Sequence, residues 1–526
     1  MKSETVHLIK NDIILQKCYP VIRTRILSHL NMKTDTDSQQ KVLLYQLNYV
    51  LQKIQPQYFE HLIDCLKESL EHNTILEIQK ETNQLISCCS SMGWSNEVLH
   101  DLIKILHGSK TDVTKWDNFK NKLCSSTFEE YHILLPFKVK AIAVPGQNNM
   151  SAKERVLDEI SHMGIEILAS ADIKNQYSYL NQIEPNQKYL LAKVYARDVY
   201  AASHSAISKI ANALNILSFY RLTEPWNIRD ISWLAVNTSN EYVKLFKSKD
   251  LYSTYDYLEG AYKIFSASKE LDRNAEQSLR TKLQATYSYA NMGKVSYAQT
   301  EKFMNTWVAL ESLCRTDMYE NIIENVLQTV PPALCLRYIY RCFRNFVEDC
   351  RRCDIDFQFS DISIDLRQTS KEKLVEEIIT VLNDRVVYQE LLDKCKINKL
   401  LLQRCNEMHL IATNANEMFQ KIDSHYTNVR RQLSRLYRLR NEIAHSALND
   451  GTSLVRYIEH LDDYLSDFVA EVVMWWSKNP QSSIENIFEI IKDNYQAYTD
   501  IKNSKKEANP IALLDSLRKT GIIALV

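Results

Sequence analysis

Apolar residues recur at the spacing of amphipathic helices over most of the chain. In the first part the pattern is clearest in Val42 to Ile54, Tyr58 to Leu70 and Val98 to Leu106. Side chains three and four positions apart share one face of a helix, so each segment would bury one stripe and leave its other side in water. No fixed repeat period accompanies the pattern, which argues against a solenoid. We therefore expect residues 1–128 to form a helical array.

The pattern becomes that of a sheet in the middle of the chain. A β-rich run covers Tyr131 to Val144 and stops at Pro145-Gly146. Further segments follow: strands at Ile165–Leu168 and Tyr189–Tyr195, a hairpin from Trp233–Val236 and Tyr242–Phe246, and helices at Glu154–Met163 and Asp198–Phe219. Strands that alternate with helices indicate a small α/β or α+β module over residues 129–265.

Helical spacing returns at about residue 270 and continues to about residue 480. The expected helices are Leu279–Met292, Ala298–Arg315, Leu336–Cys350, Lys373–Leu382, Val387–Leu402, Ser424–Leu448 and Leu454–Trp476. Asn449-Asp450-Gly451 would end the Ser424 helix. Pro480 opens a tail, residues 481–526, which we expect to be polar and exposed at first, with Ile511–Val526 docking back. The fold class is therefore mainly α, ending in a helical bundle.

Composition excludes several classes of nucleotide-binding protein. The chain has 526 residues but only 8 glycines and 10 prolines. Few glycines leave little material for tight turns, which favours helices. No Walker-type phosphate loop and no glycine-rich dinucleotide fingerprint can be written from these glycines.

The formal net charge of −1 rules out a polycationic coat for nucleic acid. Any contact with RNA or DNA must therefore come from local clusters of basic residues. Two helices carry such clusters: Arg430, Arg431, Arg435, Arg438 and Arg440 on one, and Arg337, Arg341, Arg344, Arg351 and Arg352 on the other. Each cluster fits a solvated helix face as well as a binding face.

The cysteines and the chain start indicate a cytoplasmic protein. The first residues contain no apolar signal core, and no run approaches the length of a membrane span. Twelve cysteines without a secretion signal are typical of reduced thiols. Cys350 and Cys353 have the spacing of half a zinc site, but no second pair accompanies them, so ordinary thiols are the better interpretation. We expect no metal and no cofactor.

The most informative segment is Arg440-Asn441-Glu442-Ile443-Ala444-His445, near the end of the last Arg-rich helix. At 100° per residue, Arg440 falls in the middle of an apolar stripe that contains Leu436, Tyr437, Ile443, Ala444 and Ala447. Asn441 and His445 share the border of this stripe, while Arg431, Arg435 and Glu442 point to the opposite side. A guanidinium on a buried stripe needs an anion or a carboxylate as its partner.

Spacing alone does not establish a site. Arg23 and His29, Arg197 and His204, and Arg404 and His409 have similar separations. Only Arg440 is followed by Asn and has a small residue before the His, within a long periodic helix. An amphipathic core helix with a surface His is the competing interpretation.

An earlier helix offers the carboxylate. Phe303, Trp307, Leu310 and Cys314 share one face of the helix at Ala298–Arg315. Glu311 follows Trp307 by four residues and lies at the edge of that face. We expect Glu311 to meet Arg440 from the facing helix, with simple solvation as the alternative.

Three features occur together in the C-terminal part of the chain: an all-α domain, an early helix with Trp307-Val308-Ala309-Leu310-Glu311, and a late helix with Arg440-Asn441 and His445. This combination resembles the HEPN superfamily (higher eukaryotes and prokaryotes nucleotide-binding). The resemblance is to the ApeA-like HEPN domains of prokaryotic defence proteins and covers about residues 275–480. It implies a helical bundle that dimerises and brings two motifs into one cleft. Many such proteins are metal-independent endoribonucleases that leave 2′,3′-cyclic phosphate ends, with Arg440, Asn441 and His445 in the motif positions.

The residue types fit that chemistry. His445 can move protons near neutral pH, and Arg440 can bind a pentacoordinate phosphorane bidentately. Asn441 can orient His445 or donate to a phosphate oxygen, and Glu311 would support Arg440. Arg431, Arg435 and Arg438 would hold flanking phosphates. The sequence contains no Asp/Glu cluster typical of a two-metal nuclease, which favours a metal-free reaction.

The leading hypothesis is therefore a defence-type or toxin ribonuclease that acts on transfer RNA, messenger RNA or phage transcripts. It would form a homodimer, with its N-terminal regions sensing a trigger or a regulatory partner. The alternative is a non-catalytic module that binds a nucleotide, RNA or another protein. A structural scaffold with a chance motif is the third hypothesis, and it predicts that Arg440→Ala is neutral or stabilising.

Overall fold

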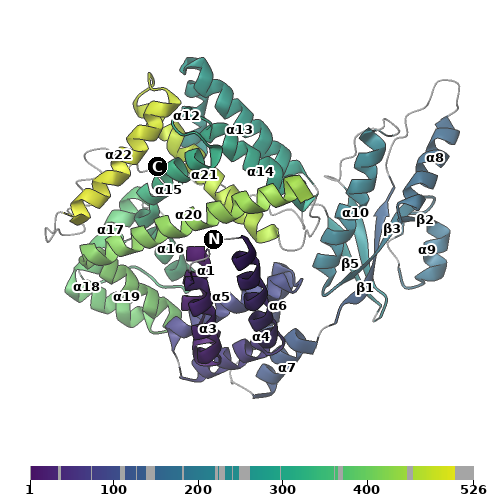
Figure 1. Cartoon of the computed structure of the whole chain (residues 1–526), viewed down its shortest axis with the longest axis horizontal. Coiled ribbons are helices and arrows are strands. Elements are labelled where there is room, and N and C mark those ends of the chain that lie inside the picture. Colours follow the sequence, from purple (N-terminus) through teal and green to yellow (C-terminus); the bar gives the residue numbers. More distant parts are fainter. Residues whose placement is uncertain are drawn as a thin grey trace. The chain divides into compact units, whose positions relative to one another are not determined.

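The computed structural model divides the chain into two compact units. The first contains Met1–Tyr255 with two short later pieces, and the second contains Asp256–Ser296, Thr300–Asn449 and Arg456–Val526. The structure describes residues 2–32, 37–72, 74–106, 113–125, 127–137, 149–180, 183–219, 223, 231–239, 241–247, 261–296, 298–360, 362–364, 371–446 and 454–503. Figure 1 shows the helices and strands of both units.

The first unit begins with the expected helical array. Its helices are α1 (Lys2–Asn11), α2 (Ile13–Lys17), α3 (Pro20–Asn31), α4 (Asp37–His72), α5 (Ile75–Ser91), α6 (Asn96–Ile103), the short 3-10 helix η1 (Lys104–Leu106) and α7 (Val113–Ser125). Helix α4 joins two of the apolar segments seen in the sequence into one 36-residue helix. Its second half supplies Leu62, Ile63 and Leu66 to a core shared with α2 and α7.

The middle of the chain forms the expected small module, a five-stranded antiparallel sheet with helices. The elements are β1 (Glu129–Pro136), α8 (Asn149–His162), β2 (Glu166–Ala169), α9 (Ser170–Gln176), β3 (Lys188–Ala196), α10 (Val199–Phe219), β4 (Ser232–Asn237) and β5 (Tyr242–Lys247). The strand order is β2-β3-β1-β4-β5, and β4 pairs with β5 as the predicted hairpin. Residues 138–144 of the expected first strand lie outside the described residues.

Both faces of this sheet are apolar because helices cover both. Ile133 on β1 is level with Ala192 and Ala235, and this face packs against α8 and α10. The neighbouring Leu134 points to the other face, which packs against α9 and the segment after it. Gly164 has φ +75° and ends α8, so the predicted break before β2 is confirmed.

The second unit is a helical bundle in which most predicted helices are confirmed. Its helices are α12 (Ala261–Asn274), α13 (Gln277–Val295), α14 (Gln299–Cys314), α15 (Ile322–Leu336), α16 (Tyr338–Arg352), α17 (Lys371–Asn383), α18 (Arg385–Cys395), α19 (Lys399–Thr413), α20 (Ala415–Ser446), α21 (Val455–Lys478) and α22 (Ile484–Asn503). Large side chains such as Phe303, Trp307, Phe468 and Trp476 are fully buried between them. The fold is mainly α, as expected.

Two expectations for this unit are wrong. The helix expected over Val387–Leu402 is two helices, because the Asn398 side chain accepts hydrogen bonds from the backbone N–H groups of Leu400 and Leu401 and caps α19. The polar tail expected after Pro480 contains α22 instead, whose Ile487 and Phe488 are buried in the core. The expected stop at residues 449–451 and the docking segment 511–526 lie outside the described residues.

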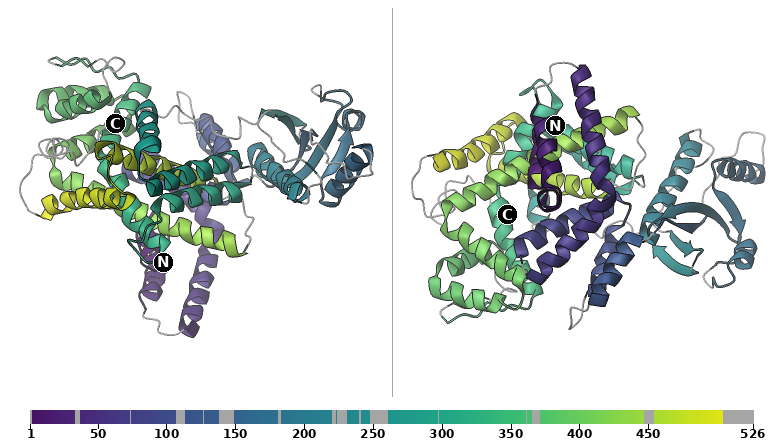
Figure 2. Two further views of the ribbon diagram at one scale, coloured as in Figure 1. Left: turned by 90° about the horizontal axis from the view of Figure 1, so that it is seen from above. Right: turned by 60° about the horizontal axis from the view of Figure 1, so that its bottom comes forward.

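Helix α20 is the longest helix of this unit, and two further views in Figure 2 show it running alongside the rest of the bundle. It begins at Ala415, nine residues earlier than the sequence indicated, and ends at Ser446, directly after the motif. Among the described helices, none is both long and apolar enough to cross a membrane.

Candidate functional site

The carboxylate of Glu311 is held inside the bundle by its own helix. On α14 the indole of Trp307 is fully buried, and its Nε1–H donates to Glu311 Oε1 at 2.6 Å. Glu311 itself is only 6% exposed, so it lies deeper than the edge position expected from periodicity. A buried carboxylate with one hydrogen bond still needs a positive partner.

Arg440 is that partner. Its Nη2 atom lies 3.6 Å from Glu311 Oε2, and 27% of the Arg440 side chain remains exposed against 7% for Glu311. The predicted pairing between the two helices is therefore confirmed. Arg440 lies on the same stripe of α20 as Leu433 and Leu436, both of which are fully buried.

Asn441 completes the immediate surroundings of the guanidinium. Arg440 Nη1 donates to Asn441 Oδ1 at 3.1 Å. In the described part of the chain no hydrogen bond joins Asn441 to His445, so the Asn side chain orients the Arg rather than the His. Arg440 Nε is buried and has no hydrogen-bond partner among the described residues. The guanidinium is thus fixed in place but retains donors for a further acceptor.

The apolar stripe of α20 is buried by other helices only up to Arg440. Tyr437 is half-buried, with its ring centroid 6.0 Å from that of Trp307. Beyond Arg440, Ile443 is half-buried while Ala444 and His445 are exposed. The expectation that Ala444 is part of a covered face is therefore wrong for this chain alone, and Ala447 lies outside the described residues. The last turn of α20 leaves the core at Arg440 and presents His445 to solvent.

The three arginines expected to bind RNA do not share the face of Arg440. Helical periodicity places Arg431, Arg435 and Arg438 about 140° or more around α20 from Arg440. Each of the three is half-buried. They can meet RNA only from a different side of the helix.

The second arginine cluster is largely neutralised by carboxylates. Arg337 pairs with Glu471 and Arg341 with Asp467, both on α21. Arg351 lies 2.9 Å from Glu348, and Arg352 lies 3.7 Å from Asp349. These pairs support the interpretation as helix packing and solvation rather than as an RNA surface.

The arginines and histidines with similar spacing elsewhere serve other contacts. Arg404 pairs with Asp349, and His409 Nδ1 contacts the carbonyl oxygen of Leu382 at 2.7 Å. Arg197 donates from Nε to the carbonyl oxygen of Met92 at 2.7 Å. At Arg440 the spacing coincides with an ion pair to the buried carboxylate of Glu311 on another helix.

Within the described ranges, no group of three or more His, Cys, Asp or Glu side chains has an arrangement that could hold a metal ion. Cys350 is buried and Cys353 is half-buried at the end of α16. The chain therefore offers a site built from Arg440, Asn441 and Glu311, with an exposed His445 on the next turn.

Comparisons of the chain with known proteins found no match. No protein-family model matches the chain, and neither the curated proteins nor the solved structures contain a match.

Proposed function

We propose that this chain is a metal-independent endoribonuclease of the HEPN type that acts in anti-phage defence or as a toxin. The observation that carries the proposal is the fixed but unsaturated guanidinium of Arg440, held 3.6 Å from the buried Glu311 at the point where α20 leaves the core. A guanidinium fixed in this way can meet a phosphate without first losing its side-chain freedom.

In the proposed reaction the RNA 2′-hydroxyl attacks the adjacent phosphorus. A bond forms between the 2′-oxygen and phosphorus, and the bond from phosphorus to the 5′-oxygen breaks. His445 removes or supplies a proton, and Arg440 neutralises the phosphorane. The products are a 2′,3′-cyclic phosphate and a 5′-hydroxyl.

Helix geometry favours a homodimer for this reaction. Arg440 and His445 are five residues apart, about 140° around α20, which separates their Cβ atoms by roughly 10 Å. The exposed last turn with Ala444 and His445 gives a second copy of the motif access to the same phosphate. Two motifs would then supply one His as base and another as acid.

A non-catalytic binding module is the second candidate function. It is favoured by the charge balance, since Glu311 already offsets much of the charge of Arg440. His445 also has no described side chain that orients it as a base. In this alternative the site binds a nucleotide or an RNA end without cleaving it.

The test compares wild type with His445→Ala on total cellular RNA in the presence of EDTA. His445 is exposed, so its removal should leave the fold intact, whereas Arg440→Ala would leave Glu311 buried and unpaired. His460→Ala is the matched control, because His460 is another exposed histidine of the same unit. We expect cleavage by wild type and His460→Ala and none by His445→Ala. RNA binding of equal strength by all three proteins, without cleavage, would favour the binding module.

A latent enzyme is distinguished by repeating the assay with lysate of phage-infected cells. The first unit, which lies outside the bundle, is proposed to sense the trigger or to restrain the nuclease. A freely active ribonuclease would damage its own cell, so control is expected of this function.

A further inference from the structure

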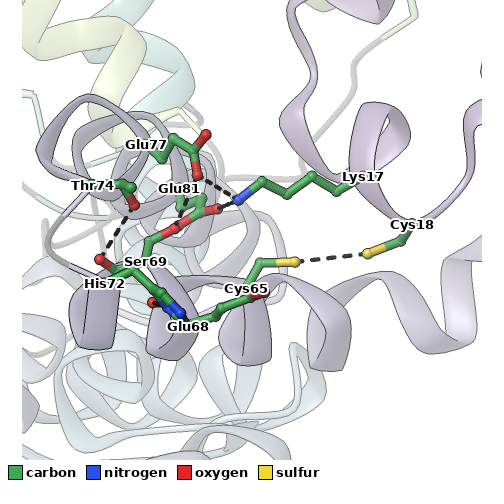
Figure 3. A network of polar contacts seen from close by, with 9 residues as sticks. All are labelled: Lys17, Cys18, Cys65, Glu68, Ser69, His72, Thr74, Glu77 and Glu81. Atoms are coloured by element: carbon green, nitrogen blue, oxygen red, sulfur yellow. Dashed lines mark hydrogen bonds and ion pairs between the residues drawn. The ribbon is translucent and has the colours of Figure 1, made fainter.

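Two thiols from distant parts of the chain meet in the first unit. Cys18 lies in the short turn between α2 and α3, and Cys65 lies on α4. Their Sγ atoms are 3.7 Å apart, and the two side chains point toward each other in Figure 3. Cys18 is exposed, while Cys65 is 7% exposed and belongs to the core of the helical array.

Both neighbours of Cys18 are tied to the helices that flank the pair. Lys17 Nζ lies 2.6 Å from Glu77 and 3.2 Å from the fully buried Glu81, both on α5 (Figure 3). On the other side, the Tyr19 hydroxyl lies 2.8 Å from Nδ1 of His61, one turn before Cys65 on α4. The turn that carries Cys18 is therefore anchored at both ends, which keeps its thiol against that of Cys65.

We propose that Cys18 and Cys65 are a reversible disulfide pair that glutathione disulfide or a similar low-molecular-weight disulfide oxidises. A disulfide bond is about 2.05 Å long, so the two sulfur atoms must approach by less than about 2 Å. Cys18 is outside the helices, and its side chain can supply this movement by rotation. The inference does not depend on the function proposed above.

The exposures of the two thiols set the order of the reaction. The Cys18 thiolate is accessible and attacks the glutathione disulfide, which gives a mixed disulfide and one glutathione thiolate. Cys65 then loses its proton to solvent, attacks Cys18 Sγ and releases the second glutathione. Two protein thiols are oxidised by two electrons, and one glutathione disulfide is reduced to two glutathione molecules.

Burial affects the second step. Burial, together with the contact to Cys18, raises the pKa of the Cys65 thiol to about 12. Only a small fraction of Cys65 is thiolate near neutral pH, so closure of the disulfide should be slower than capture of glutathione at Cys18. The mixed disulfide should therefore be visible as an intermediate, and closure should accelerate as the pH rises.

Other cysteines provide the controls. Glutathione disulfide does not reach buried thiols such as those of Cys314, Cys335, Cys350, Cys395 and Cys405. Cys124 lies in the same unit as the pair and is half-buried. It tests whether partial exposure alone is sufficient for oxidation.

The experiment treats the full chain with glutathione disulfide and maps its peptides by mass spectrometry without reduction. We expect a Cys18–Cys65 linked peptide that lacks two hydrogen atoms, appears after glutathionylated Cys18, and disappears with dithiothreitol. Cys124→Ser should behave like wild type, and Cys18→Ser should form no link. Cys65→Ala should accumulate the mixed disulfide at Cys18.

Two results would overturn the proposal. One is a mixed disulfide at Cys18 that lasts as long in wild type as in Cys65→Ala, because Cys65 would then not displace glutathione. The other is a set of cross-links spread among unrelated cysteines. Because Cys18 is exposed, Cys18→Ser is expected to fold, and its circular dichroism spectrum checks this.

Discussion

Glu311 defines the chemistry available to Arg440. The carboxylate is nearly fully buried and accepts one hydrogen bond from Trp307, so its burial is costly unless a positive group lies nearby. Arg440 supplies that charge and is oriented in return. The pair therefore acts as a unit, and neither residue can be removed without changing the other.

The interdependence of this pair is testable by a double-mutant cycle. Glu311→Gln and Arg440→Met should each lower the free energy of unfolding by about 1–3 kcal/mol, because each leaves a desolvated polar partner. The loss of unfolding free energy in the double variant should be smaller than the sum of the two single losses by roughly 1 kcal/mol or more. Urea unfolding followed by circular dichroism measures all four proteins. Additive losses would show that the two side chains do not interact.

His425 on α20 predicts a pH dependence of stability. Its ring stacks on Tyr338 with centroids 3.7 Å apart, and burial, with Arg341 and Lys421 nearby, lowers its pKa to about 3. A lowered histidine pKa contributes stability above the unfolded value near 6.5 that is lost as the pH falls toward the folded value. In this window wild type should lose up to about 1.4 kcal/mol per pH unit through His425.

The matched variant is His425→Phe, which keeps an aromatic ring against Tyr338 but does not titrate. Its unfolding free energy should fall less steeply than that of wild type between about pH 6.5 and 4. The difference between the two profiles isolates the contribution of His425, because the other groups titrate in both proteins. Parallel profiles would contradict a neutral, half-buried His425.

At the scale of elements, the strands of the sheet module and its helices α8 and α10 were predictable, whereas helix α9 and the order of the strands were not. Along its strands, apolar residues either alternate with polar ones or form short runs, and the segments that begin at Trp233 and Tyr242 pair as a hairpin. Helix α15 was not predicted, because Pro331 and Pro332 within it are normally helix breakers. Helix α22 follows a polar segment, and only its packing reveals that Ile487 and Phe488 are core residues.

The candidate site was partly predictable for similar reasons. Periodicity placed Arg440 on an apolar stripe and Glu311 on a facing helix, and the structure brings them together. The hydrogen bond from Arg440 to Asn441 and the exposure of Ala444 could not be read from the sequence. The hydrogen bond depends on the side-chain conformations of two adjacent residues, and the exposure of Ala444 depends on which other helices cover the last turn of α20; periodicity specifies neither.

Helix α14, which carries Glu311, is positioned by a close approach to α13. A Cβ atom added to Gly293 on α13 would lie 2.7 Å from Thr306 Oγ1 and 3.2 Å from the carbonyl oxygen of Lys302. Gly293→Ala should therefore lower the unfolding free energy by about 1–2 kcal/mol, since overpacking outweighs the better helix propensity of alanine. Thermal or urea unfolding measures this loss.

The neighbouring Met292 gives the control for that prediction. Its side chain is 46% exposed on the same helix, so Met292→Ala should change stability by no more than about 0.5 kcal/mol. A stable Gly293→Ala protein would mean that α13 and α14 are not in close contact.

At the scale of the whole molecule, the proposed nuclease requires two copies of the chain. We expect the full-length protein to sediment as a dimer at micromolar concentration, and His445→Ala to remain a dimer. Substituting the half-buried Ile443 by Glu should weaken association, because it places a charge on the uncovered last turn of α20. A wild-type protein that is monomeric and still cleaves RNA would contradict the two-motif arrangement.

The end groups of RNA cut by the wild-type protein in EDTA decide whether the chain is a nuclease of the proposed kind. We expect fragments with 2′,3′-cyclic phosphate and 5′-hydroxyl ends, produced by wild type and not by His445→Ala. Fragments with 5′-phosphate ends, or cleavage that persists unchanged in His445→Ala, would contradict this proposal.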